Sequence, residues 1–330
     1  MDIVQNAIQA AVSPEAIYFC LAAVGLNLQF GYTGLINFGQ TAFLAVGGYA
    51  VAVGVLTLEI GLWLSLLMGI AGAVVLAVLL GIPTLRLRAD YLAIVTIAAA
   101  EIVRLVFGSV PLGEWFGGPF GLNGFADTYA GLNPFTPSSV YDFWFLSFRG
   151  NSLWSMLVGW SLVALASLLV WMLVRSPWGR VQKAIREDED AVRSLGKNVY
   201  AYKMQSLIIG GVIGTVGGFM LALNQTSTVP SDFTTETTFL AFTMLILGGA
   251  ARVMGPVLGA IVFWGFLSLM EGVFDKATSG DDPFLPTWLV DSSQASAFRF
   301  MIVGIALMLL MIYRPQGILG DRKEIALDAR

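Results

Sequence analysis

Residues that commonly perform catalysis are scarce in this sequence. It contains no histidine and one cysteine, Cys20, so the usual imidazole metal sites, proton shuttles and Ser/His/Asp triads are absent. No Gly-x-x-x-x-Gly-Lys-[Ser/Thr] phosphate loop occurs, and the chain therefore has no recognisable nucleotide-binding site. No basic groove with interleaved aromatic residues indicates a nucleic-acid partner. These absences argue against an enzyme and point to binding or passage of a solute.

Polar side chains gather between residues 25 and 50, in an otherwise apolar stretch. Such groups are costly in lipid unless they are paired or face a cavity, and closely spaced glycines weaken a continuous helix. A broken span that lines a polar path accounts for the cluster, whereas tighter helix packing is an equal alternative for each residue singly. The candidate path residues are Asn27, Gly31, Tyr32, Thr33, Gly34, Asn37, Gly39 and Gln40.

Two further patterns lie inside predicted spans. Glu101 and Arg104 are one helical turn apart. An ionisable residue at that depth is a functional candidate, yet a neutralised pair that fixes two helices together is the favoured interpretation. Gly210, Gly214 and Gly218 recur every four residues, which predicts close helix contact rather than substrate binding.

The composition places these residues in a bilayer. Of 330 residues, 57% are hydrophobic and only 12% are charged, whereas about a quarter of a soluble chain is charged. Since a span needs roughly 20 apolar residues, we expect one all-α, polytopic transmembrane domain over residues 1–330, with about nine helices and a range of roughly eight to ten. A re-entrant segment is the alternative within 15–56 and within 237–272. The predicted spans are 15–30, 35–56, 62–82, 91–108, 153–174, 203–223, 237–253, 255–272 and 297–313.

Residues 175–203 form the one long charged segment between spans. Their apolar positions share one helical face, which predicts an amphipathic helix that begins near Pro177 and stops at Gly196. Because Lys and Arg concentrate in cytoplasmic loops, we place this segment and the tail 314–330 in the cytoplasm, which puts 14 of the 18 basic residues on that side. The N-terminus and the loop 109–152 then lie outside. That loop, rich in Gly, Phe and Trp, is expected to be a packed cap or a docking surface.

Three separated stretches resemble the permeases of branched-chain (hydrophobic) amino acid ABC transporters, the LivM/LivH type. They are GLNLQFGYTGLINFGQTAFLAVGGYA, LRLRADYLAIVTIAAAEIVR, and SPWGRVQKAIREDEDAVRSLGKNVYAYK followed by LGGAARVMGPVLGA. The resemblance extends, in order, from about residue 20 to about residue 317. The sequence departs from it at Gln40, where many relatives carry His, at Ala89, where Gly is usual, and at Ala98 to Ala100. These departures affect the expected substrate rather than the family.

The resemblance implies a transport machine with several subunits. A second permease, more often a paralogue than a second copy, two cytoplasmic ATPases and an external substrate-binding protein are the expected partners, along with membrane lipid. ATP and magnesium would bind the ATPases, and no cofactor or metal is expected in this chain. The expected location is the cytoplasmic membrane of a prokaryote, and the expected activity is inward transport of branched-chain or other hydrophobic amino acids by alternating access.

In this interpretation the charged segment is a coupling helix that sits in a groove of the ATPase. Attachment to the membrane surface is the alternative, but four successive acidic residues would be repelled by an anionic leaflet. The residues expected to couple are Gly179, Arg180, Ala184, Ile185, Arg186, Glu187, Asp188, Glu189, Ala191, Leu195 and Gly196. Two other functions stay open: the same machine carrying urea, a short amide or another amino acid, and a carrier or channel that works without ATPases.

Overall fold

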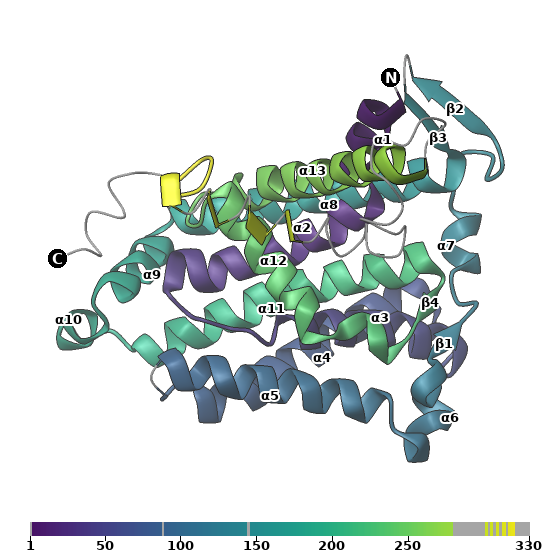
Figure 1. The fold of residues 1–330 in the computed structure, drawn as a ribbon. Coiled ribbons are helices and arrows are strands. Elements are labelled where there is room, and N and C mark those ends of the chain that lie inside the picture. Colours follow the sequence, from purple (N-terminus) through teal and green to yellow (C-terminus); the bar gives the residue numbers. More distant parts are fainter. Residues whose placement is uncertain are drawn as a thin grey trace.

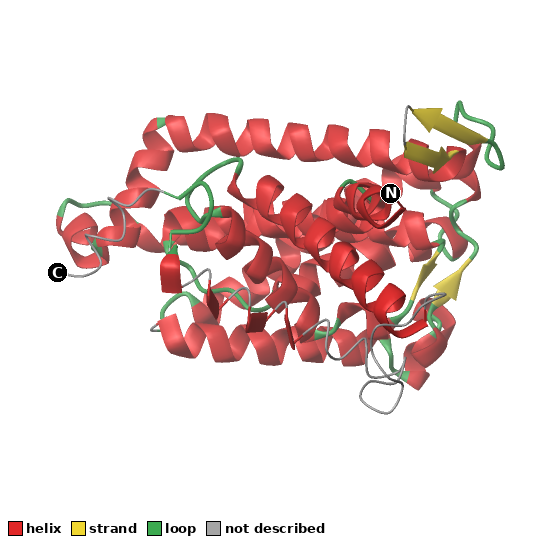
Figure 2. Ribbon diagram, turned by 45° about the horizontal axis from the view of Figure 1, so that its top comes forward, coloured by secondary structure: helices red, strands yellow, loops and turns green. Residues whose placement is uncertain are grey.

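The computed structural model describes residues 2–87, 89–143 and 146–279 and, with gaps, residues 301–320. Helices make up most of this part of the chain, as Figure 2 shows. The long helices are α1 (Asp2–Ala11), α2 (Pro14–Leu26), α3 (Gln40–Leu56), α4 (Gly61–Thr84), α5 (Ala89–Phe107), α8 (Gly150–Arg175), α9 (Pro177–Glu187), α11 (Val199–Gln225), α12 (Thr235–Gly248) and α13 (Gly255–Ser279). The predicted all-α architecture is confirmed.

Shorter elements connect these helices. A π-helix, η1 (Asn27–Tyr32), continues α2, and α10 (Glu189–Ser194) follows α9. Between α5 and α8 lie η2 (Val110–Leu112), α6 (Gly113–Phe116), η3 (Gly118–Phe120), β1 (Leu122–Asn123), α7 (Asp127–Gly131), β2 (Val140–Phe143) and β3 (Leu146–Arg149), and between α11 and α12 lie β4 (Ser227–Thr228) and η4 (Pro230–Phe233).

The centre of the bundle is α11, which packs against α2, α3 and α4 (Figure 1). Its glycines allow this approach, as their spacing predicts. A Cβ at Gly218 would lie 1.9 Å from the Leu44 carbonyl oxygen of α3, and one at Gly214 would lie 2.3 Å from the side chain of Gln40. A larger residue at Gly218 would have to move the backbone of α3, whereas one at Gly214 would have to displace the Gln40 side chain.

Length and composition support several membrane crossings. Among the described residues, α4, α8, α11 and Gly255–Lys276 of α13 are long and apolar enough to cross a bilayer, and two bent helix pairs raise this number to as many as six. The bent pairs are α1 with α2 and η1, and α5 with the helical turns up to Phe116. α3 and α12 are apolar but shorter. The range 297–313 lies partly outside the described residues, so the count of nine spans stays a prediction.

The sequence pattern did not predict two local features. α1 is a separate helix that precedes the first expected span and packs on α13. Two small antiparallel sheets also accompany the helices: β1 pairs with β4, and β2 forms a hairpin with β3. The segment 109–152 is packed rather than extended, because Phe125 and Tyr129 are buried against the bundle.

The two ends of the bundle differ. Figure 1 shows α9 and α10 at one end, and α6, α7 and the strands at the opposite end, where α1 also begins. Residues 316–320 return to the end of α12, where Ile318 and Leu319 donate backbone hydrogen bonds to Leu247 and Gly248. The bundle therefore separates the charged segment from the loop 109–152.

Candidate functional site

The first polar cluster lies where a helix breaks. α2 passes into the π-helix η1, and the chain then runs without regular structure until α3 begins at Gln40. Gly34 adopts a φ of 74°, a left-handed conformation that favours glycine, and the Leu35 N–H turns back to the Gln29 carbonyl over 2.8 Å. The predicted break is thus present, between residues 33 and 39.

Asn27 fastens this break to the turn between α12 and α13. Its amide nitrogen donates to the Arg252 carbonyl over 2.8 Å, and its oxygen accepts from the Ala251 N–H over 2.9 Å. Ala251 has a φ of 58°, which is unfavourable for a residue with a Cβ. The two bonds hold this strained turn against η1.

A second chain of hydrogen bonds joins the break to α11. Gln29 donates to the Leu207 carbonyl over 3.2 Å and accepts from Asn37 over 2.9 Å, and Asn37 in turn accepts from the Gly39 N–H over 2.9 Å. Gln40 donates to the Gly210 carbonyl over 3.1 Å. All three amide side chains are fully buried. The network therefore satisfies polar groups that would otherwise be costly in the membrane.

Hydroxyl groups from later helices complete the network. Thr33 and Ser206 are 2.7 Å apart, and both donate to the Leu28 carbonyl. Thr96 accepts from the Phe38 N–H, and Thr238 accepts from the Thr41 N–H. Sequence reasoning did not single out Ser206, Thr96 and Thr238, although single hydroxyl residues inside apolar runs were the available signal.

The candidate path residues thus lie together, and all of them are buried except Gly34, which is exposed. In this conformation their polar side chains pair with one another and with backbone groups of other helices, which is the arrangement expected for tight packing. Gln40 Oε1 has no hydrogen-bond partner among the described residues. That these residues line a solute path stays a prediction.

The charged segment forms two helices where one was expected. α9 ends at Glu187, and Asp188 adopts an extended conformation with φ −154° and ψ 102°. Its carboxylate accepts from the N–H groups of Asp190 and Ala191, over 3.0 Å and 2.9 Å, and so caps α10. The single-helix prediction was wrong because this capping outweighs helix continuation. Gly196, with a φ of 76°, ends the segment as predicted.

The predicted coupling residues divide by exposure. Gly179 and Ile185 are buried against the bundle, and Ala184 and Glu189 are half-buried. The others form an exposed tip, which we define as the coupling tip: Arg180, Arg186, Glu187, Asp188, Ala191, Leu195 and Gly196. Leu195, an apolar side chain between the charged residues Arg193 and Lys197, is 80% exposed.

The charged segment, residues 175–203, contacts η1 directly. The Arg186 guanidinium donates to the Gly31 carbonyl over 2.7 Å, and Lys183 lies 5.7 Å from the centre of the Tyr32 ring. Glu189 forms an ion pair with Arg193 at 2.9 Å, as its spacing predicts, and another with Lys203 of α11. A crevice of about 260 Å³ is lined by residues of both the charged segment and the break, and Gly34 lies against the Arg186 side chain. These contacts join the charged segment to both the break and the central helix.

Glu101 and Arg104 pair along one helix rather than between two. Arg104 Nε donates to Glu101 Oε2 over 2.9 Å, and Arg104 Nη2 donates a second hydrogen bond to Glu101 Oε1. Their side chains are 41% and 27% exposed on the outer face of α5. The expectation that this pair fixes two helices together was wrong, because both side chains belong to α5 and the i, i+3 spacing satisfies them locally.

Among the described residues, no group of three or more His, Cys, Asp or Glu side chains could hold a metal ion. Cys20 is buried and free.

Known proteins resemble this chain over nearly its whole length. The family described as the permease component of the branched-chain amino acid transport system matches residues 10–312. The high-affinity branched-chain amino acid permease proteins LivM of Salmonella typhimurium and Escherichia coli are each 30% identical, over 93% of this chain and 69% of theirs. A probable LivM of Methanocaldococcus jannaschii is 26% identical over 93% of this chain and 92% of its own. The chain belongs to the family of permease components of branched-chain amino acid transport systems, and it is a multi-pass membrane protein.

Proposed function

We propose that this chain is the membrane-spanning subunit of an ATP-driven importer and carries branched-chain amino acids into the cell by alternating access. Relatives named for branched-chain amino acid transport, at 30% identity, support this cargo. ATP hydrolysis belongs to two partner ATPases, because the chain has no phosphate loop of its own. A second permease and an external binding protein complete the machine.

One observation carries the coupling assignment: Arg186 links the coupling tip to the helix break. Its guanidinium holds the Gly31 carbonyl at the end of η1, and η1 is fastened by Asn27 to the α12–α13 turn. A displacement of α9 by an ATPase would therefore reach α2, α11 and α12 through hydrogen bonds between rigid elements. The coupling tip lies in the cytoplasm, as the distribution of basic residues favours. The start of α1 then lies outside.

The assembly experiment uses the exposed tip. Leu195→Glu and Glu187→Lys change side chains that face away from the bundle, so the fold is expected to persist. We expect co-purification of the ATPases with this chain to fall at least about tenfold for Leu195→Glu. Glu114→Lys, an exposed change in the loop 109–152, is the matched control and should leave assembly intact. Full retention of assembly and of substrate-stimulated hydrolysis in both tip variants would contradict the proposal.

Cargo and energy source are tested together in proteoliposomes that contain the whole complex and its binding protein. Uptake of leucine, isoleucine and valine should require internal ATP and should exceed uptake of urea. Uptake that persists without the ATPases would instead support a carrier or channel. ATP-dependent uptake of urea alone would support the same ATP-driven importer with urea as its cargo.

A further inference from the structure

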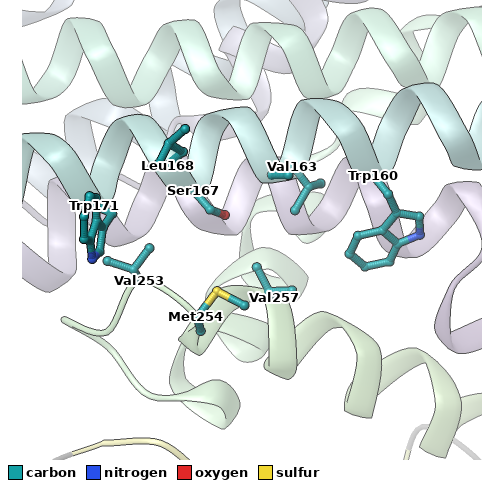
Figure 3. Close-up of a pocket in the computed structure, with 9 residues that line it drawn as sticks. Trp160, Val163, Ser167, Leu168, Trp171, Val253, Met254 and Val257 are labelled. Carbon is teal, nitrogen blue, oxygen red and sulfur yellow. The ribbon is translucent and has the colours of Figure 1, made fainter.

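An apolar groove runs along the outer side of α8, apart from the coupling segment and the polar network. Its volume is about 530 Å³, and Figure 3 shows its walls, formed by α8 on one side and by the α12–α13 turn and the start of α13 on the other. Trp160 and Trp171 stand at its two ends, and Val253, Met254 and Val257 face them. At 1.5 Å per residue, the two tryptophans are separated by roughly 16 Å along the helix. This length can hold the ester region of a lipid and the first part of one acyl chain.

Ser167 supplies a polar group in the middle of the groove. The residue is 7% exposed, and its hydroxyl points into the groove without a hydrogen-bond partner among the described residues. Other serines of this region differ: Ser161 donates to the Leu157 carbonyl four residues earlier, and Ser176 donates to Leu173. A buried hydroxyl without a partner is costly. The Ser167 hydroxyl is therefore available to donate to an acceptor that enters the groove.

A cation stands at the end of the groove near α9. The Arg175 guanidinium lies 4.3 Å above the Trp171 ring, which turns it back along α8 toward Ser167. Arginine binds phosphate by paired hydrogen bonds, and tryptophan prefers the membrane interface. Along α8 from Arg175 to Trp160, the surface presents first a cation, then a hydroxyl donor and then the apolar groove.

We propose that this groove binds one glycerophospholipid from the leaflet on the side of α9. The phosphate contacts Arg175, an ester carbonyl accepts the Ser167 hydroxyl, and one acyl chain lies between α8 and the start of α13. This order matches the order of groups in the lipid: phosphate, ester and hydrocarbon. Because the groove also includes Val253 and Met254 of the turn that Asn27 holds, a bound lipid would stabilise that turn.

The first experiment blocks the groove and counts lipids. The assembled complex is purified in maltoside detergent, supplied with phosphatidylglycerol or with diacylglycerol, and measured by native mass spectrometry. Ala164→Trp fills the groove, whereas Leu165→Trp places the same ring on the neighbouring outward face of α8, where Leu165 is 61% exposed. We expect phosphatidylglycerol retention to fall about tenfold in Ala164→Trp only. Equal retention in both variants would overturn the proposal.

The second experiment tests the polar groups with small changes. Ser167→Ala and Arg175→Gln should each lower phosphatidylglycerol retention several-fold, whereas Ser161→Ala, whose hydroxyl is already bonded within the helix, should not. Diacylglycerol lacks the phosphate and should bind poorly even to the wild-type protein. Diacylglycerol retained as well as phosphatidylglycerol, or crosslinks that place the second permease over the groove, would overturn the proposal. Neither result would affect the proposed transport function.

Discussion

The guanidinium of Arg186 lies 2.7 Å from the carbonyl oxygen of Gly31. This bond joins the exposed helix α9 to the π-helix in which the first membrane span ends. It connects residues 155 positions apart, and it lies at the boundary between the charged segment and the buried polar network.

Asn27 is predicted to stabilise the fold through the turn at Ala251 and Arg252. Asn27→Leu would leave the buried Ala251 N–H without its partner, which costs about 1–3 kcal/mol. It would also remove one of the two bonds to the Arg252 carbonyl, which still accepts from the Gly255 N–H. We expect a lower unfolding temperature in detergent. Asn151→Ala removes an exposed side-chain hydrogen bond and should have little effect. If both variants unfold at the same temperature as the wild-type protein, Asn27 does not hold this turn.

Gly218 is predicted to set the distance between α11 and α3. Gly218→Ala would place a methyl group 1.9 Å from the Leu44 carbonyl, and we expect a loss of about 1–3 kcal/mol in the free energy of unfolding. Gly131→Ala is the control, because a Cβ there meets nothing within 4 Å. Thermal unfolding of both variants in detergent provides the measurement. An unchanged Gly218→Ala variant would mean that the helices separate readily.

Glu101 and Arg104 are predicted to compensate each other without taking part in transport. Glu101→Gln should destabilise the protein, because it leaves the Arg104 charge unpaired in a span, whereas the double change to Gln and Met should recover much of the loss. Uptake by the double variant should match that of the wild type when normalised to folded protein. Lost uptake in a stable double variant would assign this pair a transport role.

Asp232 is predicted to make stability depend on pH. Burial raises the pKa of this carboxyl above its ordinary value of 3.8, and the hydrogen bond from the Val229 N–H offsets the effect only in part. The folded protein then binds this proton more tightly than the unfolded chain, so stability should fall as pH rises through that window. Asp232→Asn should raise the unfolding temperature at neutral pH and flatten this dependence, whereas the exposed Asp142→Asn should do neither. A steeper pH dependence in Asp232→Asn would contradict the assignment.

Much of the helical framework could be predicted from hydrophobic runs. A helix needs a long apolar stretch whether it faces the lipid or the core of the protein. The interruption after Tyr32 was also predictable, since three glycines and several amides make a continuous helix unfavourable there. Partners such as the Arg252 carbonyl were not predictable, because they lie more than 200 positions away along the chain. Only the fold brings them together.

In the charged segment, the sequence pattern predicted only part of the local structure. Its amphipathic pattern predicted a helix, yet it did not predict the interruption at Asp188, where a side-chain cap competes with the backbone. The i, i+4 spacing of Arg186 and Asp190 would suit an ion pair on one continuous helix. Instead α9 ends between them, and the Arg186 guanidinium donates to a backbone carbonyl of η1. Local spacing describes one isolated helix, and tertiary contacts decided the outcome.

The most direct measurement of the central claim is the number of ATP molecules hydrolysed per amino acid imported by proteoliposomes with an Arg186→Met complex. Because this change removes the bond to Gly31 but leaves the apolar side of α9 in place, we predict an assembled complex that still hydrolyses ATP and imports at least about tenfold less amino acid per ATP. Lys197→Met, an exposed change beyond α10, serves as the control and should match the wild type. An Arg186→Met complex with the wild-type ratio of hydrolysis to import would contradict the account.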